Sequence, residues 1–420
     1  MSIRRVVVIG AGSVGLSTAW FLQRAGVEVC VIEGAQVASG SSSGNAGWLT
    51  PSLVLPLAEP GLLRSGVRMM LSPASPLYVP PALDPHLLRF LAGFARHCTI
   101  GRWRAAAAAL GRASSRMLGA YDAMRGDAEA AVAAPTTPAE PLLAVFDSEA
   151  ARERLLEELR GLRELGFTQR YELLDAAGTR EASPLLSGAA RCGLALEDQR
   201  FINPIAFVHG IGNAVRTGGG EILTGRPATK VSRRGSTVAV ALSDGASVEA
   251  DAAVIATGSW LERLARDHGV RRLVQAGRGY SFTVHPERAP GHPIYLPAQR
   301  VACTPLGGPD DGLRVAGMME FRPPDAPLDP RRIRAIVDAA APMFTGIDWS
   351  ARTDEWVGAR PCTTDGLPLV GRTATEGVFV AGGHGMWGIA LGPLTGQILA
   401  RQITGDGDDP LLRAFDPLRR

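Results

Sequence analysis

The stretch VVVIGAGSVGLSTAWFLQRAGVEVCVIE, residues 6–33, decides the fold class of this chain. An apolar run typical of a buried strand turns at Gly10, Gly12 and Gly15 into a predicted helix, and a second apolar strand follows. In such a turn the first glycine permits a tight bend, the second lets backbone approach a pyrophosphate, and the third lets the helix pack closely. Glu33, which ends the second strand, is placed to bind an adenosine ribose. The stretch predicts a Rossmann-like α/β unit that binds a dinucleotide, with FAD, NAD and NADP all open.

Length, composition and charge describe a globular chain with a large core. The 420 residues are enough for two domains or for one large α/β unit with insertions. The hydrophobic fraction is 46% and the charged fraction 20%. The net charge is +3, and the arginines are scattered among acids rather than massed in one stripe, so no nucleic-acid binding is predicted. Lys230 is the only lysine, which argues against Schiff-base chemistry.

The cysteines and the apolar runs predict a cytoplasmic protein. The chain has five cysteines, at Cys30, Cys98, Cys192, Cys303 and Cys362. They lie far apart without CxxC spacing, which predicts reduced thiols and neither a disulfide framework nor a metal site. The apolar run after Arg4-Arg5 is short and belongs to the glycine motif rather than to a signal peptide. Because no stretch reaches the roughly 18 apolar residues of a spanning helix, any membrane contact should be peripheral.

The middle of the chain predicts a second domain inserted into the first. Residues 38–56 are too rich in Ser and Gly for a regular element and are predicted to be a binding loop. Residues 57–125 show helical spacing, notably in LLRSGVRMML and PHLLRFLAGFARH, and these helices pack on the core or touch a membrane surface. A helix is predicted to start at Asn203-Pro204. A hairpin pattern then leads to a buried strand and the turn Ala256-Thr257-Gly258.

A second strand–glycine–helix pattern lies near the C-terminus. A strand is predicted at residues 378–381, glycines break it, and a helix should begin near Gly388. A flavin ring gathers negative charge at its N1/C2 edge on reduction, where backbone N–H groups and a positive helix end stabilise it. The pattern therefore favours a flavin over a nicotinamide ligand. A glycine loop shaped only for packing is the alternative.

Several motifs together resemble a known family. They are SGNAGWLTP, GRGYSF, RVAGMMEF, GARPCTTDGLPLVG and AGGHGMWGIALGPLTG, with the first glycine motif. This set is similar to the FAD-dependent D-amino acid oxidase superfamily, nearest the bacterial D-amino acid dehydrogenases, from residue 5 to about 404. The N-terminal motif is shared by many flavoproteins, whereas the pair GARPCTTDGLPLVG and AGGHGMWGIALGPLTG is far more specific.

The resemblance implies a fold and a domain division. The expected fold is α/β: an FAD-binding Rossmann-like domain of the glutathione-reductase type, and a substrate domain of mixed or antiparallel sheet with helices. The FAD-binding domain is assigned residues 1–52, 185–272 and 352–420. The substrate domain is assigned residues 53–184 and 273–351.

The resemblance also implies which residues bind FAD. Those expected at its ADP part and pyrophosphate are Gly10, Gly12, Ser13, Val14, Gly15, Glu33, Ser41, Ser42, Ser43, Thr257 and Gly258, with the backbone of Val231 at adenine. Those expected beside the flavin ring are Asn45, Ala46, Gly47, Trp48 and Leu49, with Gly385, Met386, Trp387, Gly388 and Ile389 at its N1/C2 edge. Cys362 does not occupy the position of the covalent link in sarcosine oxidases, so noncovalent FAD is expected, and no metal.

Three residues are candidates for the catalytic site. Arg360 matches the arginine that binds the substrate carboxylate in glycine and D-amino acid oxidases. No acid follows it until Asp365, so a buried guanidinium there needs an anion, unless it pairs with a remote acid such as Glu355. His384 is either a catalytic base or a positioning residue. Tyr280 lies either in the pocket wall or in the core.

The resemblance finally implies a reaction. It is the oxidative deamination of D-amino acids to 2-oxo acids and ammonia by hydride transfer from Cα to flavin N5, with electrons passed to a quinone or another carrier. An oxidase or dehydrogenase of the same superfamily for glycine, sarcosine or D-hydroxyproline is one alternative. An electron-transfer FAD subunit of a hetero-oligomer is another. The side-chain preference, the acceptor and the oligomeric state are not determined by the residues.

Overall fold

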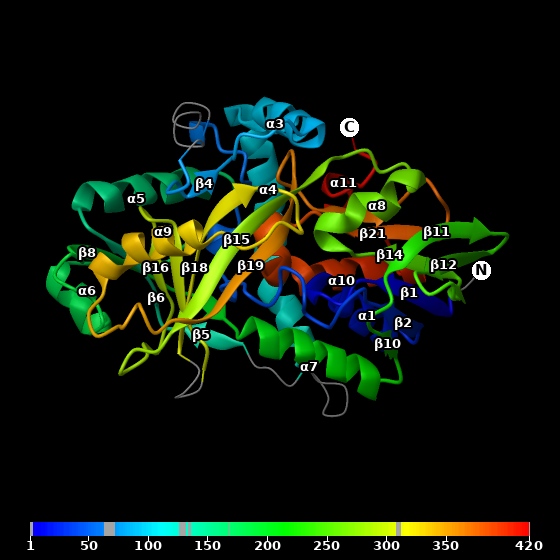
Figure 1. The fold of residues 1–420 in the computed structure, drawn as a ribbon, viewed down its shortest axis with the longest axis horizontal. Helices are drawn as coiled ribbons and strands as arrows, with labels where there is room; N and C mark the ends of the chain where they lie inside the picture. The colour runs from blue at the N-terminus through cyan, green and yellow to red at the C-terminus, as the bar shows by residue number, and fades with distance from the viewer. Residues whose placement is uncertain are drawn as a thin grey trace.

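Two large sheets standing side by side form the molecule. The computed structural model describes residues 3–62, 72–125, 132, 136–167, 169–307 and 312–419. In Figure 1 a six-stranded sheet with α1 and α10 lies to the right and a nine-stranded sheet to the left. From residue 63 on, the predicted helix LLRSGVRMML lies outside the described residues. Among the described residues, no helix combines the length and the apolar character that crossing a membrane requires.

The six-stranded sheet forms the nucleotide-binding half. Its strand order is β10 (Glu221–Leu223), β2 (Glu28–Ile32), β1 (Arg5–Ile9), β14 (Ala252–Ile255), β21 (Val378–Gly382) and β20 (Leu369–Arg372). All neighbours run parallel except β20, which is antiparallel to β21. The central strands β1 and β14 are apolar except for Arg5 at the start of β1, because both faces of the sheet are covered, as parallel sheets require.

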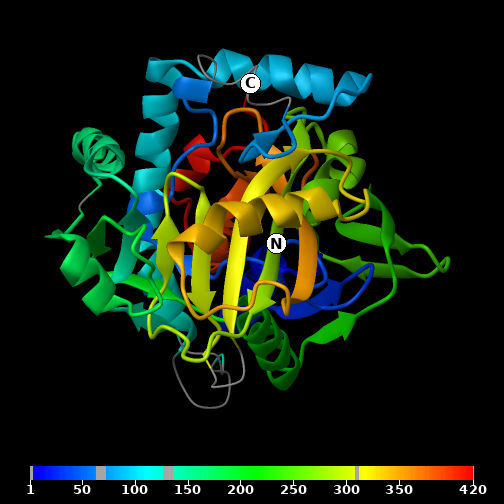
Figure 2. The same cartoon turned by 60° about the vertical axis from the view of Figure 1, so that its left-hand side comes forward.

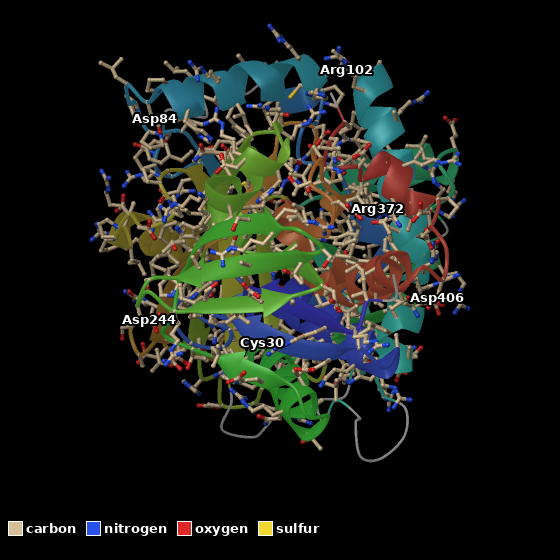
Figure 3. All side chains as sticks on the ribbon, turned by 90° about the vertical axis from the view of Figure 1, so that its right-hand side faces the viewer. Cys30, Asp84, Arg102, Asp244, Arg372 and Asp406 are labelled. Carbon is tan, nitrogen blue, oxygen red and sulfur yellow. The ribbon has the colours of Figure 1, made fainter. Side chains whose placement is uncertain are left out.

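Each face of this sheet has its own cover. Val6 and Val8 face a helical layer, whereas Val7 and Ile9 face a second core under a small antiparallel sheet. The helical layer contains α1 (Ser13–Arg24), α4 (Ile100–Met124), α7 (Pro204–Thr217) and α10 (Gly388–Thr404). The other layer contains β11 (Ala228–Arg234), β12 (Thr237–Leu242), β13 (Ser247–Ala250) and α8 (Leu261–Ala265). Figure 3 shows both layers from the right-hand side of Figure 1, with the exposed residues Asp244, Arg372 and Asp406 labelled.

The nine-stranded sheet forms the other half. Its order is β19 (Thr353–Thr363), β15 (Val274–Val284), β18 (Leu313–Phe321), β17 (Val301–Pro305), β16 (Ile294–Leu296), β6 (Leu142–Phe146), β8 (Cys192–Leu196) and β7 (Tyr171–Leu174), with β4 (Leu77–Tyr78) beside β18. Helix α9 (Pro330–Ala340) crosses one face (Figure 2) and closes an apolar core there. The opposite face of β15 and β19 borders the first half and carries Arg360.

Shorter elements complete the described chain. The helices are α3 (Pro85–His97), α5 (Glu149–Arg163), α6 (Ala176–Ala182) and α11 (Leu411–Ala414), with single 3-10 turns at Pro51–Leu53, Gly258–Trp260, Arg266–His268, Ala341–Met343 and Gly385–Trp387. A third small sheet joins β3 (Trp48–Leu49), β9 (Gln199–Phe201) and β5 (Thr137–Ala139). Helix α7 starts where predicted, because Asn203 Oδ1 accepts the N–H of Ala206 at 3.2 Å and Pro204 fits the first turn.

The mixed α/β fold class is confirmed, and the domain boundaries stay a prediction. Strands β8 and β19 both pair within the nine-stranded sheet, although residues 185–272 and 352–420 were assigned to the FAD-binding domain. These two strands therefore pair with strands of the segments that were assigned to the substrate domain. Their apolar and alternating patterns do not reveal which sheet a strand joins, because pairing is decided by distant partners.

Candidate active site

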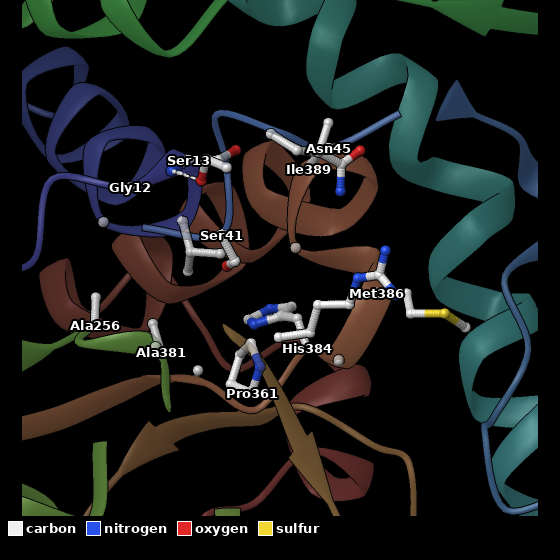
Figure 4. A pocket seen from close by; sticks show the side chains of 18 residues that line it. Gly12, Ser13, Ser41, Asn45, Ala256, Pro361, Ala381, His384, Met386 and Ile389 are labelled. Carbon is white, nitrogen blue, oxygen red and sulfur yellow. Dashed lines mark hydrogen bonds between the residues drawn. The ribbon is translucent and has the colours of Figure 1, made fainter. Parts of the chain in front are cut away.

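A cavity opens between the two halves, where segments far apart in sequence meet (Figure 4). Its lining contains these predicted residues: Gly12, Ser13, Val14, Gly15, Ser41, Ser42, Asn45, Gly258, Arg360, His384, Gly385, Met386, Gly388 and Ile389. It also contains Ala256, Pro361, Ala381 and Gly382, which were not predicted. Ala256 follows β14 and Ala381 lies near the end of the parallel neighbour β21. The cavity thus lies at the carboxyl ends of the strands, where open α/β sheets bind ligands.

The glycines of the first turn serve two different purposes. Gly10 has a φ of +116°, and a Cβ there would overlap the carbonyl oxygen of Ala256. A Cβ on Gly15 would overlap the carbonyl oxygen of Gly10. A Cβ on Gly12, in contrast, would meet only Ser42 Oγ, at 3.4 Å. The protein itself therefore leaves room for a Cβ at Gly12, and the open space there is available to a ligand.

Two helix N-termini border the cavity without a side-chain cap. Helix α1 begins after Gly12, and α10 begins after Trp387, and neither N-cap residue bonds the first turn through its side chain. The free N–H groups and the positive helix ends suit a ligand that is anionic at one end and has an electron-rich carbonyl edge at the other. Ser13 N–H donates to Ser42 Oγ at 3.2 Å, which ties the loop at residues 41–45 to α1 (Figure 4). These features fit FAD.

Glu33 closes the first turn from outside the cavity. Its carboxylate accepts the N–H of Ala11 at 2.8 Å and the N–H of Ala35 at 2.9 Å, through different oxygens. A carboxylate oxygen accepts more than one hydrogen bond, so these contacts leave capacity for a ribose hydroxyl. Glu33 is thus held in place before any nucleotide arrives.

Arg360 lies in a shaped recess on β19. Its guanidinium covers Gly279 of the neighbouring strand β15 so closely that a Cβ on Gly279 would lie 2.2 Å from Arg360 Cζ. One terminal nitrogen, Nη1, donates to the carbonyl oxygen of Met318 at 3.1 Å. Burial lowers the pKa of the Arg360 guanidinium below its usual value. The guanidinium is therefore oriented by backbone on two strands rather than by a carboxylate.

Neither acid near Arg360 in sequence is its partner. Glu355 is paired with Arg352 at 2.7 Å. Asp365 is paired with Arg419 at 2.8 Å and lies 3.4 Å from Arg272. Within the described part of the chain, Arg360 has no ion pair. An arginine that is withdrawn from water in this way is a strong site for an incoming carboxylate.

A β-bulge aims the Met318 carbonyl at Arg360. Arg278 pairs with Glu320 and Tyr280 with Gly317, which leaves Met318 and Met319 of β18 opposite Gly279 alone. Met318 has a φ of +61°, a conformation that costs energy for a residue with a side chain. Such an irregularity turns a backbone group out of the ladder. Here the group turned out is the carbonyl that holds Arg360.

His384 is a neutral, buried residue at the edge of the cavity. Burial lowers its pKa to about 3, so the imidazole carries no charge at neutral pH. Its Nε2 is 2.9 Å from Thr395 Oγ1 on α10, and its buried Nδ1 has no hydrogen-bond partner among the described residues. These contacts fix the turn at residues 384–388 to α10. They favour the positioning interpretation over a catalytic base.

Tyr280 lies in the core and outside the lining of this cavity, which is one of the two positions that the sequence left open for it. Its side chain is fully buried, and its hydroxyl donates to Glu320 Oε1 at 2.6 Å. Because successive residues of a strand point to opposite faces, Gly279 faces Arg360 and Tyr280 faces the core under α9. Burial and the Glu320 carboxylate both raise the pKa of its phenol.

Nine further predicted residues are not in the lining of this cavity. They are Gly10, Ser43, Ala46, Gly47, Trp48, Leu49, Val231, Thr257 and Trp387. The Trp48 indole donates to Thr304 Oγ1 at 2.8 Å, toward the nine-stranded sheet. The Trp387 indole donates to the carbonyl of Leu55 at 2.8 Å. Their roles toward FAD stay predictions.

Gly279 and Met318, which contact the Arg360 guanidinium, are the residues around it that were not predicted from the sequence. The motif GRGYSF places two glycines inside a strand, which signals a bulge or a close approach. That signal was available for Gly279. Nothing local marks Met318, because its role is carried by a backbone carbonyl.

Cys362 is unsuited to a covalent flavin link. Its thiol is 3% exposed, and a Cβ on Gly277 would lie 2.6 Å from its sulfur. Burial raises its pKa to about 12, so the reactive thiolate is absent at neutral pH. This supports the prediction of noncovalent FAD.

Comparison with known proteins identifies the family of this chain. The model of the FAD dependent oxidoreductase family matches residues 5–402. The D-amino acid dehydrogenase of Phenylobacterium zucineum (strain HLK1) is 31% identical over 431 residues, which cover 99% of this chain and 99% of that protein. The D-amino acid dehydrogenase of Cereibacter sphaeroides (strain ATCC 17029) is 31% identical over 424 residues, covering 98% and 94%.

Solved structures share the fold. Glycine oxidase from Geobacillus kaustophilus superimposes with a TM-score of 0.72 at 19% identity, covering 99% of both chains. The L-alpha-glycerophosphate oxidase from Mycoplasma pneumoniae, solved with FAD bound, superimposes with a TM-score of 0.69 at 16% identity, covering 96% of this chain and 95% of that one. The resemblance, the enzyme class and the cofactor are thereby confirmed. The chain belongs to the FAD dependent oxidoreductase family.

Proposed function

We propose that this enzyme oxidises D-amino acids to 2-oxo acids and ammonia and passes the electrons to a quinone or another carrier. The observation that carries the proposal is Arg360, a guanidinium without an ion pair in the described chain that lines a cavity between two helix N-termini. The names of the full-length relatives support the substrate class. The α-carboxylate, which all amino acids share, is the group that this arginine suits best.

The chain's own residues bind FAD, orient the substrate and exclude water from the reaction site. Gly12, Ser13 and Ser42 would hold the pyrophosphate at the start of α1, and Gly385–Ile389 would hold the N1/C2 edge of the ring. Arg360 binds the substrate carboxylate in a bidentate manner, so that Cα is held in one orientation. When bound, FAD supplies the two-electron acceptor for the hydride of Cα. The imino acid that results reacts with water and gives the 2-oxo acid and ammonia.

His384 acts as a positioning residue in this scheme. Its neutral imidazole is fixed by Thr395, and no base is needed if the substrate amine is already neutral when the hydride leaves. The turn that carries His384 borders the flavin-binding segment 385–389. Its role is therefore to hold this turn against α10.

A quinone acceptor is supported by an apolar surface at α3. Leu83, two residues before α3, is fully exposed, Leu88 on α3 is 54% exposed, and Ile100 at the start of α4 is 59% exposed. Arg89 and Arg96 lie on α3, and basic residues beside apolar ones suit an anionic membrane surface. We propose a peripheral contact with the membrane here.

An anaerobic substrate panel tests the reaction. The flavin of the purified enzyme should bleach on addition of D-amino acids and remain yellow with L-amino acids. Glycine, sarcosine and D-hydroxyproline form the comparison set, because the fold is shared with glycine oxidases. If only glycine, sarcosine or D-hydroxyproline bleached the flavin quickly, the enzyme would be an oxidase or dehydrogenase for these substrates instead. Dye reduction by the purified single chain would exclude a subunit that only transfers electrons.

Substitution of Arg360 tests the carboxylate anchor. Arg360→Ala should keep its FAD and lose roughly 10² to 10⁴ in kcat/KM, because one partner of a buried ion pair is removed. Arg360→Lys should recover only part of this, since an ammonium lacks the planar fork. Amino-acid amides should be poor substrates of the wild type, and their kcat/KM should fall much less on mutation of Arg360 than that of the free amino acids. If Arg360→Ala still preferred the free acid over the amide as strongly as the wild type does, Arg360 would not be the residue that binds the carboxylate.

A further inference from the structure

A second groove lies beside the reaction cavity and shares no lining residue with it. It is lined by Ser43, Asn203, Pro204, Ile205, Ala206, Thr283, His285, Leu306, Arg314, Thr353 and Asp354. Its volume is about 440 Å³, which lies in the range of small-molecule sites. The groove has polar groups on the sheet side and apolar groups on the side of α7.

Arg314 is the central group of this groove. It is only 5% exposed, its Nη1 donates to Ser281 Oγ at 3.3 Å, and its buried Nε has no hydrogen-bond partner. Throughout the described residues no acid lies within ion-pair distance of it. The other fully buried arginines differ, since Arg278 and Arg332 both lie beside Glu320. Arg314 therefore resembles Arg360 in having no ion pair among the described residues, although Arg314 is buried and Arg360 is half-buried. An anionic ligand would stabilise either cation.

Further groups extend the polar side of the groove. Thr283 is 1% exposed, and its Oγ1 has no partner in the described structure. The N-terminus of α7, a helix of fourteen residues, opens into the groove at Asn203–Ala206 and adds a positive end. Asp354 is the only acid of the lining, and it is exposed. The groove thus combines the carboxylate of Asp354, the hydroxyl of Thr283 and the guanidinium of Arg314.

We propose that this groove is a second binding site for an α-amino acid, separate from the reaction site at Arg360. Arg314 and Thr283 take the carboxylate, Asp354 takes the ammonium, and the side chain lies against Pro204, Ile205 and Leu306. A simple inorganic anion would satisfy Arg314 but would leave Asp354 facing a like charge. The proposal rests on the proposed function for the class of ligand.

The groove is physically connected to the reaction site. Arg360 covers Gly279 of β15, and Arg314 bonds Ser281, so their anchoring points lie two residues or about 7 Å apart on one strand. The loop at residues 41–45 lies between the two cavities: Ser42 and Asn45 face the first, and Ser43 faces the second. Gly44 packs against the Trp356 ring. An amino acid bound in the groove is therefore placed to move on to Arg360 as a substrate. It is also placed to shift the loop at residues 41–45.

Thermal denaturation of the FAD-loaded enzyme tests the site without relying on turnover. The probe is 2-aminoisobutyrate, an amino acid that has no Cα hydrogen and cannot be oxidised. It is titrated into Arg360→Ala, where the reaction site is disabled. The Tm should rise by roughly 1–2 °C for each tenfold increase in probe above its Kd. Arg360→Ala/Arg314→Met should lose this response, and the control Arg360→Ala/Arg352→Met should keep it, because Arg352 lies outside the groove.

Asp354 separates an amino-acid site from a general anion site. Isobutyrate, which lacks the ammonium, should raise the Tm of Arg360→Ala less than 2-aminoisobutyrate does, and Asp354→Asn should abolish this difference. Because Asp354 is exposed, this variant tests the site even if Arg314→Met does not fold. Equal responses to isobutyrate and the amino acid, or an undiminished response in the Arg314→Met variant, would overturn the proposal. Failure of the Arg360 anchor would instead appear as retained turnover in Arg360→Ala.

Discussion

The recess at Gly279 allows a sharp test of how Arg360 is positioned. Gly279→Ala adds one methyl group to the strand beside the guanidinium and removes no charge and no hydrogen-bonding group. The new Cβ would lie 2.2 Å from Arg360 Cζ and 2.6 Å from Nε. Ordinary contact between such atoms begins near 3.4 Å, so the guanidinium must move by more than about 1 Å. The bond to the Met318 carbonyl, now 3.1 Å, would break or lengthen with it.

A displacement of this size predicts a loss of about 10² in kcat/KM. A misplacement of 1 Å in a positioned reactant costs about that factor, because Cα no longer sits in the reactive orientation. The assay is steady-state kinetics with a D-amino acid and a dye acceptor, together with flavin absorbance and Tm. Gly291→Ala is the matched control, since nothing lies within 4 Å of its added Cβ. Both variants should keep FAD, and only Gly279→Ala should lose turnover.

The kinetic pattern distinguishes positioning from a general loss of structure. In Gly279→Ala, kcat/KM should fall far less for amino-acid amides, which do not bind the guanidinium in a bidentate manner, than for the free acids. Wild-type kcat/KM for the free acids would refute the recess as the device that positions Arg360. So would an equal loss for acids and amides.

Three further predictions concern cofactor, acceptor and pH. Gly12→Val should fold, because the protein leaves room at this position, and should lose FAD, because the side chain occupies the pyrophosphate space; a fully flavinated variant would contradict this. After anaerobic reduction by substrate, the yellow colour should return slowly in air and quickly with a soluble quinone, whereas rapid stoichiometric peroxide would indicate an oxidase. Burial raises the pKa of Asp365, but hydrogen bonds and charge from Arg419 and Arg272 outweigh this and lower it to about 2. Since the unfolded pKa is near 3.9, the ionised carboxylate stabilises the fold by roughly 2 kcal/mol at neutral pH, and this is lost as pH falls from about 4 to 2. The difference in free energy of unfolding between wild type and Asp365→Asn, measured in urea, should shrink over that interval and remain constant above pH 5.

Local patterns determined the nucleotide-binding half of the molecule. The spacing of Gly10, Gly12 and Gly15 between two apolar strands requires only contiguous residues, since strand, turn and helix are neighbours along the chain. The same holds for the C-terminal turn before α10 and for the start of α7 at Asn203-Pro204. Arg360 was identified as a candidate anchor through its motif, and the absence of a neighbouring acid pointed to the same role.

Tertiary structure alone decided the surroundings of that anchor. Which acids pair with which arginines depends on strands that are distant in sequence, and the fold commits Glu355 to Arg352 and Asp365 to Arg419. The face on which Tyr280 lies depends on the register of β15, which no local pattern specifies. The carbonyl that holds Arg360 comes from a bulge on another strand and is independent of the Met318 side chain. The sequence by itself therefore determined the two glycine turns that line the cavity, because they are encoded in contiguous residues, whereas the charge and geometry around Arg360 arise only when three strands pack together.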